Sequence, residues 1–363
     1  MQYAHRATLH HVEFYVSDAE ARAAEMVEVY GFRVFGRNTA DDHRSVAVRQ
    51  GDITFVYTQA LTPEHAAHTY TDTHGDAPAV IWLACDDARA AFQEAVAAGA
   101  IALQEPVEDS VSRCVTATIR AFGNVRHTFL QWLPGADTKH IAPGIIASAQ
   151  DRPNEGVGLL AVDHFAVCVP AGQLDATIAY YEQALGFRKI FEEQIIVGRQ
   201  SMLSQVVQNA AGDVTLTIIE PDTTREPGQI DKFIREHGGA GVQHIAFSCC
   251  DVVDSVRMLR AAGVVFLSSP DTYYENLPKR LSLRKYDVAE LRDLGLLADS
   301  DHAGQLFQIF TRSTHPRGTF FLELIERLGA ETFGSGNIKA LYEAVEQDMT
   351  APASGGGGTG REH

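Results

Sequence analysis

Apolar and polar residues alternate in several short runs along this chain, and this period of two predicts β-strands. The clearest runs are His11–Val16, Val162–Val169, Val242–Cys249 and Phe320–Glu326. Between such runs the period changes. Ile178, Tyr181 and Leu185 fall at positions i, i+3 and i+7 and are followed by Gly186. That spacing predicts an amphipathic helix that ends at a glycine.

The pattern repeats within the chain. His11–Val16 is followed by a helix-like stretch and then by Gly31-Phe32-Arg33. The same order recurs in His164–Val169 and Gly186-Phe187-Arg188, with His11 and His164 separated by 153 residues. A repeat of this length indicates two homologous halves rather than an array of short repeats.

Two further segment pairs support the repeat. Asp87–Gly99 and Asp251–Gly263 share length and apolar pattern, and Thr128–Gln131 resembles Phe320–Glu323. Each half therefore reads as strand, helix and several strands, followed by the same order again. We expect an α+β fold in which each half contains two βαβββ modules that form one curved sheet.

The repeat also predicts the domain plan. Residues 1–135 form the first half, which lacks a metal site, and residues 159–350 form the second, catalytic half. The intervening residues 136–158 are rich in proline and glycine, which is typical of a linker. The tail, residues 351–363, contains four consecutive glycines, and we expect it to be disordered.

Composition excludes several classes of function. The 363 residues include 47 acidic and 30 basic residues, so the net charge of −17 disfavours binding to nucleic acid. No apolar run approaches the ~18–20 residues of a membrane span, and the N-terminus lacks the apolar core of a signal peptide. The five cysteines contain no CxxC pair, so we expect a cytoplasmic protein without disulfides.

Three predicted strands carry polar residues on faces that are otherwise apolar: His164, His244 and Glu323. A buried carboxylate is costly unless a partner or a metal neutralises it. Two imidazoles and one carboxylate also form the facial triad of non-haem Fe(II) enzymes. The alternative is that the histidines are hydrogen-bonded core residues and that the glutamate faces solvent. The spacing alone leaves both interpretations open.

The repeat adds one observation to this choice. Aligning the two halves places His11, Val80 and Gln131 at the positions of the three polar residues. The complete set of candidate ligands is therefore found only in the second half. His11 lacks suitable partners, and we interpret it as a structural residue.

Six segments resemble the 4-hydroxyphenylpyruvate dioxygenase family of the vicinal oxygen chelate superfamily. They are Val162–Phe165, Tyr180–Phe187, Gly239–Ala246, Gly304–Thr311, Phe321–Arg327 and Phe333–Ile338. The resemblance implies Fe(II) held by His164, His244 and Glu323. It also implies open curved barrels with outer helices and a C-terminal helix that closes the site.

The resemblance extends to one branch of the family. Most members form homogentisate, and a smaller branch forms 4-hydroxymandelate from the same substrate. This chain has Ile219 where the ring-hydroxylating branch usually has asparagine, and Ile338 and Tyr342 where that branch usually has phenylalanine. The runs Asp42–Ser45 and Val48–Gly51 also resemble the mandelate-forming branch. We therefore expect a 4-hydroxymandelate synthase, with homogentisate formation or metal-free ligand binding as alternatives.

The resemblance also suggests which residues contact the substrates, 4-hydroxyphenylpyruvate and O2. Gln308 is the candidate catalytic contact, although an ordinary strand glutamine would bond only to backbone. Ser204 and Thr217 could bind the phenol or only satisfy local backbone groups. The full set of predicted substrate contacts is Ser204, Thr217, Ile219, Gln308, Phe310, Phe333, Asn337, Ile338 and Tyr342. We expect neither nucleic acid nor a membrane as partner, and the sequence is compatible with a homodimer.

Overall fold

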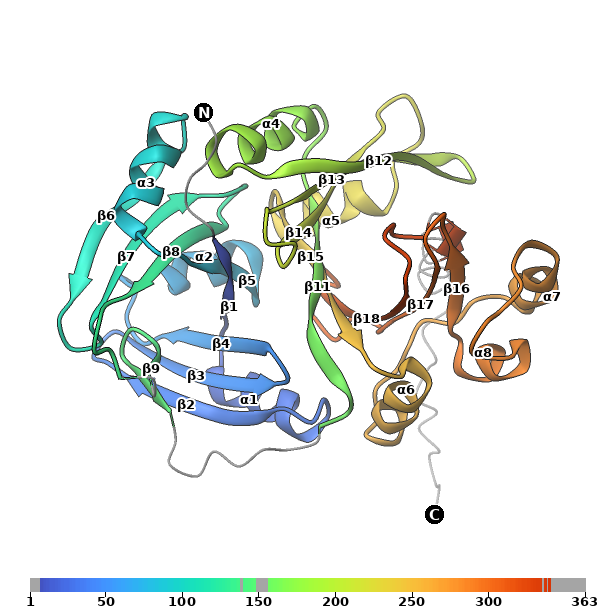
Figure 1. The fold of residues 1–363 in the computed structure, drawn as a ribbon, viewed down its shortest axis with the longest axis horizontal. Helices are drawn as coiled ribbons and strands as arrows, with labels where there is room; N and C mark the ends of the chain where they lie inside the picture. Colours follow the sequence, from blue (N-terminus) through green and yellow to red (C-terminus); the bar gives the residue numbers. More distant parts are fainter. Residues whose placement is uncertain (1–6, 138–139, 148–155, 335, 338, 341–363) are drawn as a thin grey trace, which may run out of the picture.

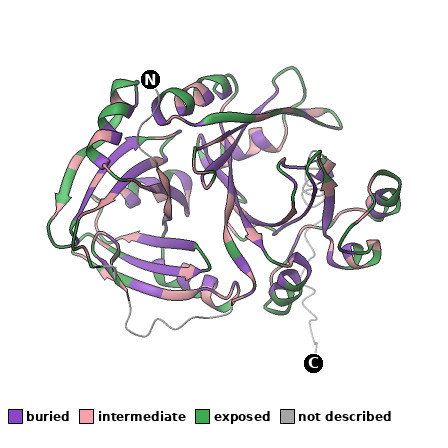
Figure 2. Cartoon of the chain, viewed as in Figure 1, coloured by how far each residue is buried: buried purple, intermediate pink, exposed green. Residues whose placement is uncertain are grey.

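The computed structural model describes residues 7–137, 140–147, 156–334, 336–337 and 339–340. The chain forms two strongly curled β-sheets that lie side by side, each with helices on its outside (Figure 1). Most of each sheet is buried, whereas the outer faces of the helices are exposed (Figure 2). This arrangement confirms the predicted α+β fold of two open, curved half-barrels.

The first sheet contains ten strands in the order β6-β7-β8-β5-β1-β4-β3-β2-β10-β9. Their bounds are β1 (Thr8–Tyr15), β2 (Arg33–Thr39), β3 (His43–Gln50), β4 (Ile53–Ala60), β5 (Ala77–Ala84), β6 (Ala102–Asp109), β7 (Cys114–Arg120), β8 (Arg126–Trp132), β9 (His140–Ala142) and β10 (Ile145–Ala147). Strand β1 lies at the centre, between parallel β4 and antiparallel β5.

The second sheet contains eight strands in the order β12-β13-β14-β11-β15-β18-β17-β16. Their bounds are β11 (Leu159–Cys168), β12 (Arg188–Val197), β13 (Gln200–Gln208), β14 (Thr215–Pro221), β15 (Gly241–Cys249), β16 (Leu297–Ser300), β17 (Gln305–Phe310) and β18 (Phe321–Leu328). Read from β2 to β6, the first sheet has the same order, so the predicted repeat is confirmed.

Eight helices between residues 19 and 294 cover the sheets. They are α1 (Ala19–Glu28), α2 (Ala66–His74), α3 (Ala88–Ala97), α4 (Leu174–Leu185), α5 (Gln229–His237), α6 (Val252–Ala261), α7 (Asp271–Arg280) and α8 (Val288–Leu294). Helix α4 buries Ile178, Tyr181 and Leu185, and it ends at Gly186 with a left-handed φ of 66°. Both features follow the predicted amphipathic pattern. Helices α7 and α8 are insertions found only in the second half.

The same polar contact fixes one helix in each of the four βαβββ modules. The last strand of each module, β4, β8, β14 or β18, provides a side-chain oxygen. This oxygen accepts a hydrogen bond from the first backbone N–H of the module's helix. The four pairs are Gln59 with Ala19, Gln131 with Ala88, Glu220 with Leu174 and Glu326 with Val252, at 3.4, 3.2, 3.0 and 2.9 Å. Each contact satisfies a helix N–H that has no intrahelical partner.

These contacts correct one part of the sequence alignment. Strand β8 pairs Trp82 with Thr128, and strand β18 pairs Ala246 with Glu323. Thr128, and not Gln131, therefore occupies the position of Glu323. The two residues are three apart, and an odd offset along a strand points a side chain to the opposite face. Gln131 accordingly points to helix α3 rather than to the inside of the sheet.

The segment between the halves, predicted as a linker, contains the short strands β9 and β10. Strand β10 extends the first sheet by pairing with β2. Residues 336–337 and 339–340 are helical and fall where the C-terminal helix is predicted; the rest of that prediction and the predicted disordered tail, residues 351–363, lie outside the described residues. Within the described part of the chain, no helix has the length and apolar character needed to cross a membrane.

Candidate metal centre

The three candidate ligands lie on adjacent central strands of the second sheet. Strands β11 and β15 place His164 opposite Ala246, and strands β15 and β18 place Ala246 opposite Glu323. The small Ala246 side chain therefore separates the two larger ones. His244 lies two residues before Ala246 on the same face of β15. The register alone thus brings the three side chains to one place inside the curled sheet.

The side-chain atoms converge closely. His164 Nε2 and His244 Nε2 lie 3.4 and 3.2 Å from the same carboxylate oxygen of Glu323, Oε2. All three residues are buried, and Glu323 is only 1 % exposed. Their ligand atoms lie within 4.8 Å of one another. A single ion could therefore contact all three groups, as a facial triad requires.

The electrostatics of the cluster favour an added positive charge. Burial alone would raise the pKa of Glu323, but the two imidazoles outweigh it and hold this pKa at about 2. Burial would lower the pKa of His164, but Glu323 and Asp163 outweigh it and raise this pKa to about 9. Burial lowers the pKa of His244. The buried carboxylate is thus ionised and paired with a proton on His164, and a divalent cation could take the place of that proton.

The outer nitrogens of the two imidazoles are compatible with metal binding at Nε2. His164 Nδ1–H donates to the carboxylate of Asp163 at 2.8 Å, which directs Nε2 toward Glu323 and leaves it free to bind a metal once its proton is displaced. His244 Nδ1 is buried and has no hydrogen-bond partner among the described residues. The His244 ring instead stacks on Phe321 at a centroid distance of 4.8 Å.

A small cavity is lined by the three candidate ligands. It contains six of the predicted substrate contacts, namely Ser204, Thr217, Ile219, Gln308, Phe310 and Phe333. Its lining also includes Ala166 and Ile195, which the sequence analysis missed because small or aliphatic strand residues carry no chemical signal. The structure therefore brings together residues from seven strands and from the segment that follows β18.

The polar groups of this cavity differ in how they are satisfied. Gln308 Nε2 donates to Glu323 Oε1 at 2.8 Å, and Asn337 Nδ2 donates to Gln308 Oε1 at 2.9 Å. Tyr273 O–H, which the sequence analysis did not single out, donates to Asn337 Oδ1 at 2.9 Å. Thr217 Oγ1, by contrast, is buried without a hydrogen-bond partner among the described residues. A ligand in the cavity could satisfy this hydroxyl.

Two aromatic rings form walls against the histidines. Phe333 and His164 form a T-shaped contact at a centroid distance of 5.1 Å, and Phe310 lies 5.9 Å from His244 in the same type of contact. Both phenylalanines are buried. The two other predicted contacts, Ile338 and Tyr342, lie outside the described residues.

Comparisons with known proteins give consistent results for both halves. Residues 6–131 match the family model described as "Hydroxyphenylpyruvate dioxygenase, HPPD, N-terminal". Residues 161–279 match the Glyoxalase/Bleomycin resistance protein/Dioxygenase superfamily. The chain is 33% identical to 4-hydroxyphenylpyruvate dioxygenase from Xenopus tropicalis, over 95% of this chain and 92% of the relative. It is 32% identical to the enzyme of the same name from Caenorhabditis elegans, over 94% of this chain and 91% of the relative.

Solved structures include similar folds. A triple mutant of 4-hydroxymandelate synthase from Streptomyces coelicolor has a TM-score of 0.84 and 40% sequence identity, covering 95% of this chain and 99% of that chain. The Mn(II)-bound glyoxalase from Novosphingobium aromaticivorans, at 13% identity and a TM-score of 0.51, covers 90% of this chain and 86% of that chain. This second likeness concerns the fold alone.

Proposed function

This chain belongs to the 4-hydroxyphenylpyruvate dioxygenase family of the vicinal oxygen chelate superfamily, and we propose that it is an Fe(II)-dependent 4-hydroxymandelate synthase. The reaction converts 4-hydroxyphenylpyruvate and O2 to 4-hydroxymandelate and CO2. One observation carries this proposal. The buried His164, His244 and Glu323 cluster adjoins a cavity lined by Ile219, which by the sequence resemblance replaces the asparagine of the ring-hydroxylating branch.

His164 Nε2, His244 Nε2 and Glu323 Oε2 would hold the Fe(II). A facial triad leaves coordination positions free for the 2-oxo acid and O2. When bound, the iron supplies the redox chemistry that activates O2 with electrons from decarboxylation of the 2-oxo acid. Gln308 supports the ligand set, because its amide N–H holds the second oxygen of Glu323 and leaves Oε2 for the metal.

The other cavity residues would orient the substrate. The Thr217 hydroxyl, which has no partner in the part of the chain that the structure describes, and Ser204 on the neighbouring strand are suited to bind the phenol group. Phe310 and Phe333 are suited to pack against the aromatic ring and to exclude water. Asn337 holds Gln308 in place through its side-chain amide. Each of these contacts fixes where the substrate lies relative to the three ligands.

Product choice depends on which substrate carbon lies nearest the metal. A shift of ~1 Å can decide this, because the reacting atoms must be closely aligned. Hydroxylation of the benzylic carbon gives 4-hydroxymandelate, whereas attack at ring carbon 1 gives homogentisate. Ile219 offers no hydrogen bond to the side chain of the substrate, and Ile338 has less bulk than a phenylalanine. Both substitutions favour a pose with the benzylic carbon closest.

The second candidate is 4-hydroxyphenylpyruvate dioxygenase, which forms homogentisate. The names of the curated relatives favour it, since the Xenopus tropicalis and Caenorhabditis elegans proteins both carry that name. A metal-free binding protein is disfavoured, because a binding site for an organic ligand does not require a buried carboxylate flanked by two imidazoles.

Product identification tests the proposal. The Fe(II)-loaded protein is incubated with 4-hydroxyphenylpyruvate and O2, and the aromatic product is separated and identified. We expect 4-hydroxymandelate with one CO2 per O2 consumed. Homogentisate as the sole product would replace the first candidate with the second. Absence of both iron uptake and CO2 release would overturn both.

A pair of substitutions tests the explanation of product choice. We expect Ile338→Phe combined with Ile219→Asn to divert part of the product to homogentisate, since the change restores bulk and a polar contact of the other branch. The product ratio is measured at equal substrate consumption. Ile195→Val, at another aliphatic position in the same cavity, is the control and should leave the ratio unchanged. A ratio that is the same in all three proteins would remove the positional explanation.

We also propose a reducing compartment such as the cytoplasm, because the five cysteines are all free. A homodimer remains compatible with the sequence, and light scattering of the purified protein measures its mass in solution.

A further inference from the structure

We infer that the ion pair between Asp163 and Arg327 is a positioning device that orients His164 as a metal ligand and holds the Phe333 wall against it. The inference rests on the proposed metal site. It assigns a role to two residues that touch neither substrate nor metal. It also predicts that the two histidine ligands are not equivalent.

A β-bulge makes the first contact geometrically feasible. Strand β11 pairs Val162 with Phe247 and His164 with Ala246, so Asp163 is an extra residue between two consecutive partners. In a regular strand, adjacent side chains point to opposite faces, but a bulge can re-aim one of them. Asp163 can therefore reach the ring of its own neighbour. Its Oδ1 accepts the Nδ1–H hydrogen bond of His164 at 2.8 Å.

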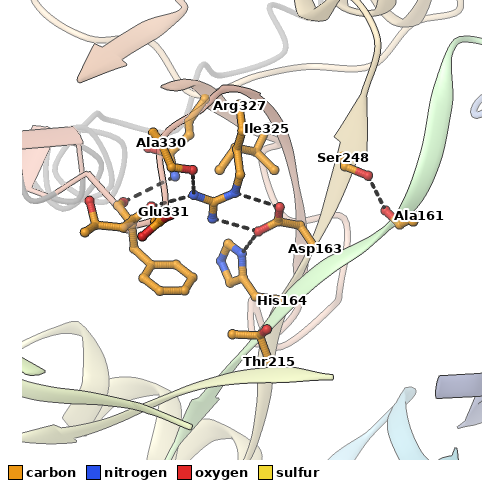
Figure 3. Close-up of polar contacts among 12 residues, drawn as sticks. Ala161, Asp163, His164, Thr215, Ser248, Ile325, Arg327, Ala330 and Glu331 are labelled. Atoms are coloured by element: carbon orange, nitrogen blue, oxygen red, sulfur yellow. Dashed lines mark hydrogen bonds and ion pairs between the residues drawn. The ribbon is translucent and has the colours of Figure 1, made fainter. Parts of the chain in front are cut away.

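Arg327 on strand β18 fixes the carboxylate that holds this histidine. Its Nε and Nη2 donate to the two oxygens of Asp163, both at 2.8 Å, so the pair is bidentate (Figure 3). The side chains of Asp163 and Arg327 are 13 % and 21 % exposed. A planar guanidinium matches a carboxylate in this way, and a lysine cannot reproduce the geometry.

The remaining groups of Arg327 bind the segment that follows β18. Nη1 donates to the carbonyl oxygens of Thr332 and Ala330, at 2.6 and 3.3 Å. The guanidinium also lies over the ring of Phe333, 5.2 Å from its centroid. Since Phe333 and His164 are in T-shaped contact, one guanidinium positions both the ligand and the ring beside it.

The ion pair occurs only where the full ligand set occurs. In the first half, the equivalent bulge places His10 at the position of Asp163, and strand β8 places Trp132 at the position of Arg327. The His10 and Trp132 rings are in a tilted contact, with their centroids 6.2 Å apart. Within the described part of the second half, His244 Nδ1 has no hydrogen-bond partner, so of the two imidazoles it is His164 that a carboxylate supports.

A carboxylate that accepts from the outer nitrogen of a histidine ligand fixes the ring and makes it a stronger donor, and loss of such a partner typically weakens metal binding by about 10–100-fold. We therefore expect Asp163→Asn, which keeps the shape but removes the charge, to weaken Co(II) and Fe(II) binding by this factor. Dissociation constants are measured by anaerobic titration of the full-length metal-free protein. Asp76→Asn, which removes the Arg22–Asp76 ion pair of the first half, is the matched control and should leave them unchanged.

A spectroscopic signal separates positioning from general stability. In the Co(II)-loaded protein, the Nδ1–H proton of a bound histidine gives an exchangeable, paramagnetically shifted NMR signal. We expect Asp163→Asn to shift the His164 signal and speed its exchange with solvent, and to leave the His244 signal in place. Thermal unfolding of each metal-free variant checks that the protein is folded.

Arg327 is tested by conservative replacement. Arg327→Lys keeps the charge but loses the fork, so we expect a higher KM for 4-hydroxyphenylpyruvate and weaker metal binding than in the parent. The double variant Asp163→Asn, Arg327→Gln removes both charges. It should bind metal as weakly as Asp163→Asn, but it should be more thermally stable than that single variant, which leaves the Arg327 charge without its carboxylate partner. If Asp163→Asn binds Co(II) within twofold of the parent and leaves the NMR signals unchanged, the inference fails. Failure of the parent itself to bind metal would instead overturn the proposed function.

Discussion

The two halves of this protein share a strand order but differ at the centre of the sheet. At the position of Ala246 in the second half, the first half has Trp82. The Trp82 indole stacks on His11 at 4.8 Å, and its N–H donates to Glu13 at 3.0 Å. The large ring thus occupies the space that the alanine methyl leaves open between His164 and Glu323.

The remaining equivalent positions differ as well. Val80 stands at the position of His244, and Thr128, whose hydroxyl pairs with that of Thr118, stands at the position of Glu323. His11 alone is retained, and its Nε2 is buried without a partner among the described residues. Both halves provide equivalent strand positions at which ligands could stand. A complete ligand set also needs a small residue, such as Ala246, between the positions of His164 and Glu323.

The largest expected effect comes from removing one candidate ligand of the second half. We expect Glu323→Ala or His244→Ala to abolish metal binding and turnover, because two remaining groups do not form a facial triad. His11→Ala, at the equivalent position of His164, should leave both within about twofold of the parent. Metal content and product formation are measured on the purified proteins. Turnover that survives in either second-half variant would refute the ligand assignment.

The helix anchors provide the next test, which concerns stability. Glu326 accepts from Val252 N–H and is also bonded to Lys285 at 2.5 Å and to Tyr286 at 2.6 Å. We expect Glu326→Ala to lower the free energy of unfolding by about 2–3 kcal/mol, since it removes a charged acceptor from Val252 N–H, Lys285 and Tyr286, while Lys285 keeps its ion pair with Asp251 at 3.1 Å. Gln131→Ala, which removes the equivalent neutral anchor, should cost about 1–2 kcal/mol. Urea denaturation measures both, and equal losses would contradict the role given to the ion pair.

The smallest expected effect concerns acid stability. His127 is fully buried, and burial lowers its pKa to about 4, so the folded protein excludes a proton that the unfolded chain binds below pH 6.5. Its contribution to stability is therefore complete above pH 6.5 and is lost as the pH falls toward 4. At pH 5 the loss is about 2 kcal/mol.

Replacing His127 with the residue at the equivalent position of the second half sharpens the test. Strand pairing equates His127 with Leu322, so His127→Leu removes the titrating group. The variant loses the contact with the Tyr181 hydroxyl and is less stable at pH 7, but its unfolding free energy should fall less between pH 7 and pH 5. An unchanged slope would show that other groups dominate acid denaturation.

Much of the fold could be predicted from the sequence because the repeat is marked by residues that tolerate few alternatives. Gly186 ends helix α4 in the left-handed conformation, as its place after an amphipathic run predicts. The alignment failed only at the last strand, where Thr128–Gln131 and Phe320–Glu323 share apolar residues. A shift of three positions preserves that similarity but reverses the face on which each side chain lies.

The candidate site was predictable where polar residues interrupt an apolar face, as His164 and Glu323 do. Ala166 and Ile195 line the same cavity, but aliphatic residues on a strand look the same whether they face a cavity or a core. The roles of Asp163 and Arg327 depend on a bulge and on strand order. Neither feature can be read from hydrophobic periodicity.

The anchor that links a strand to the first turn of a helix has a consequence for the origin of this protein. Gln59, Gln131, Glu220 and Glu326 all make it, although two are amides and two are carboxylates. A contact present in all four modules is most simply inherited from a single ancestral module that was duplicated twice. The candidate ligand positions differ between the halves whereas the anchor does not, so the anchor was kept through changes that altered the centre of the sheet.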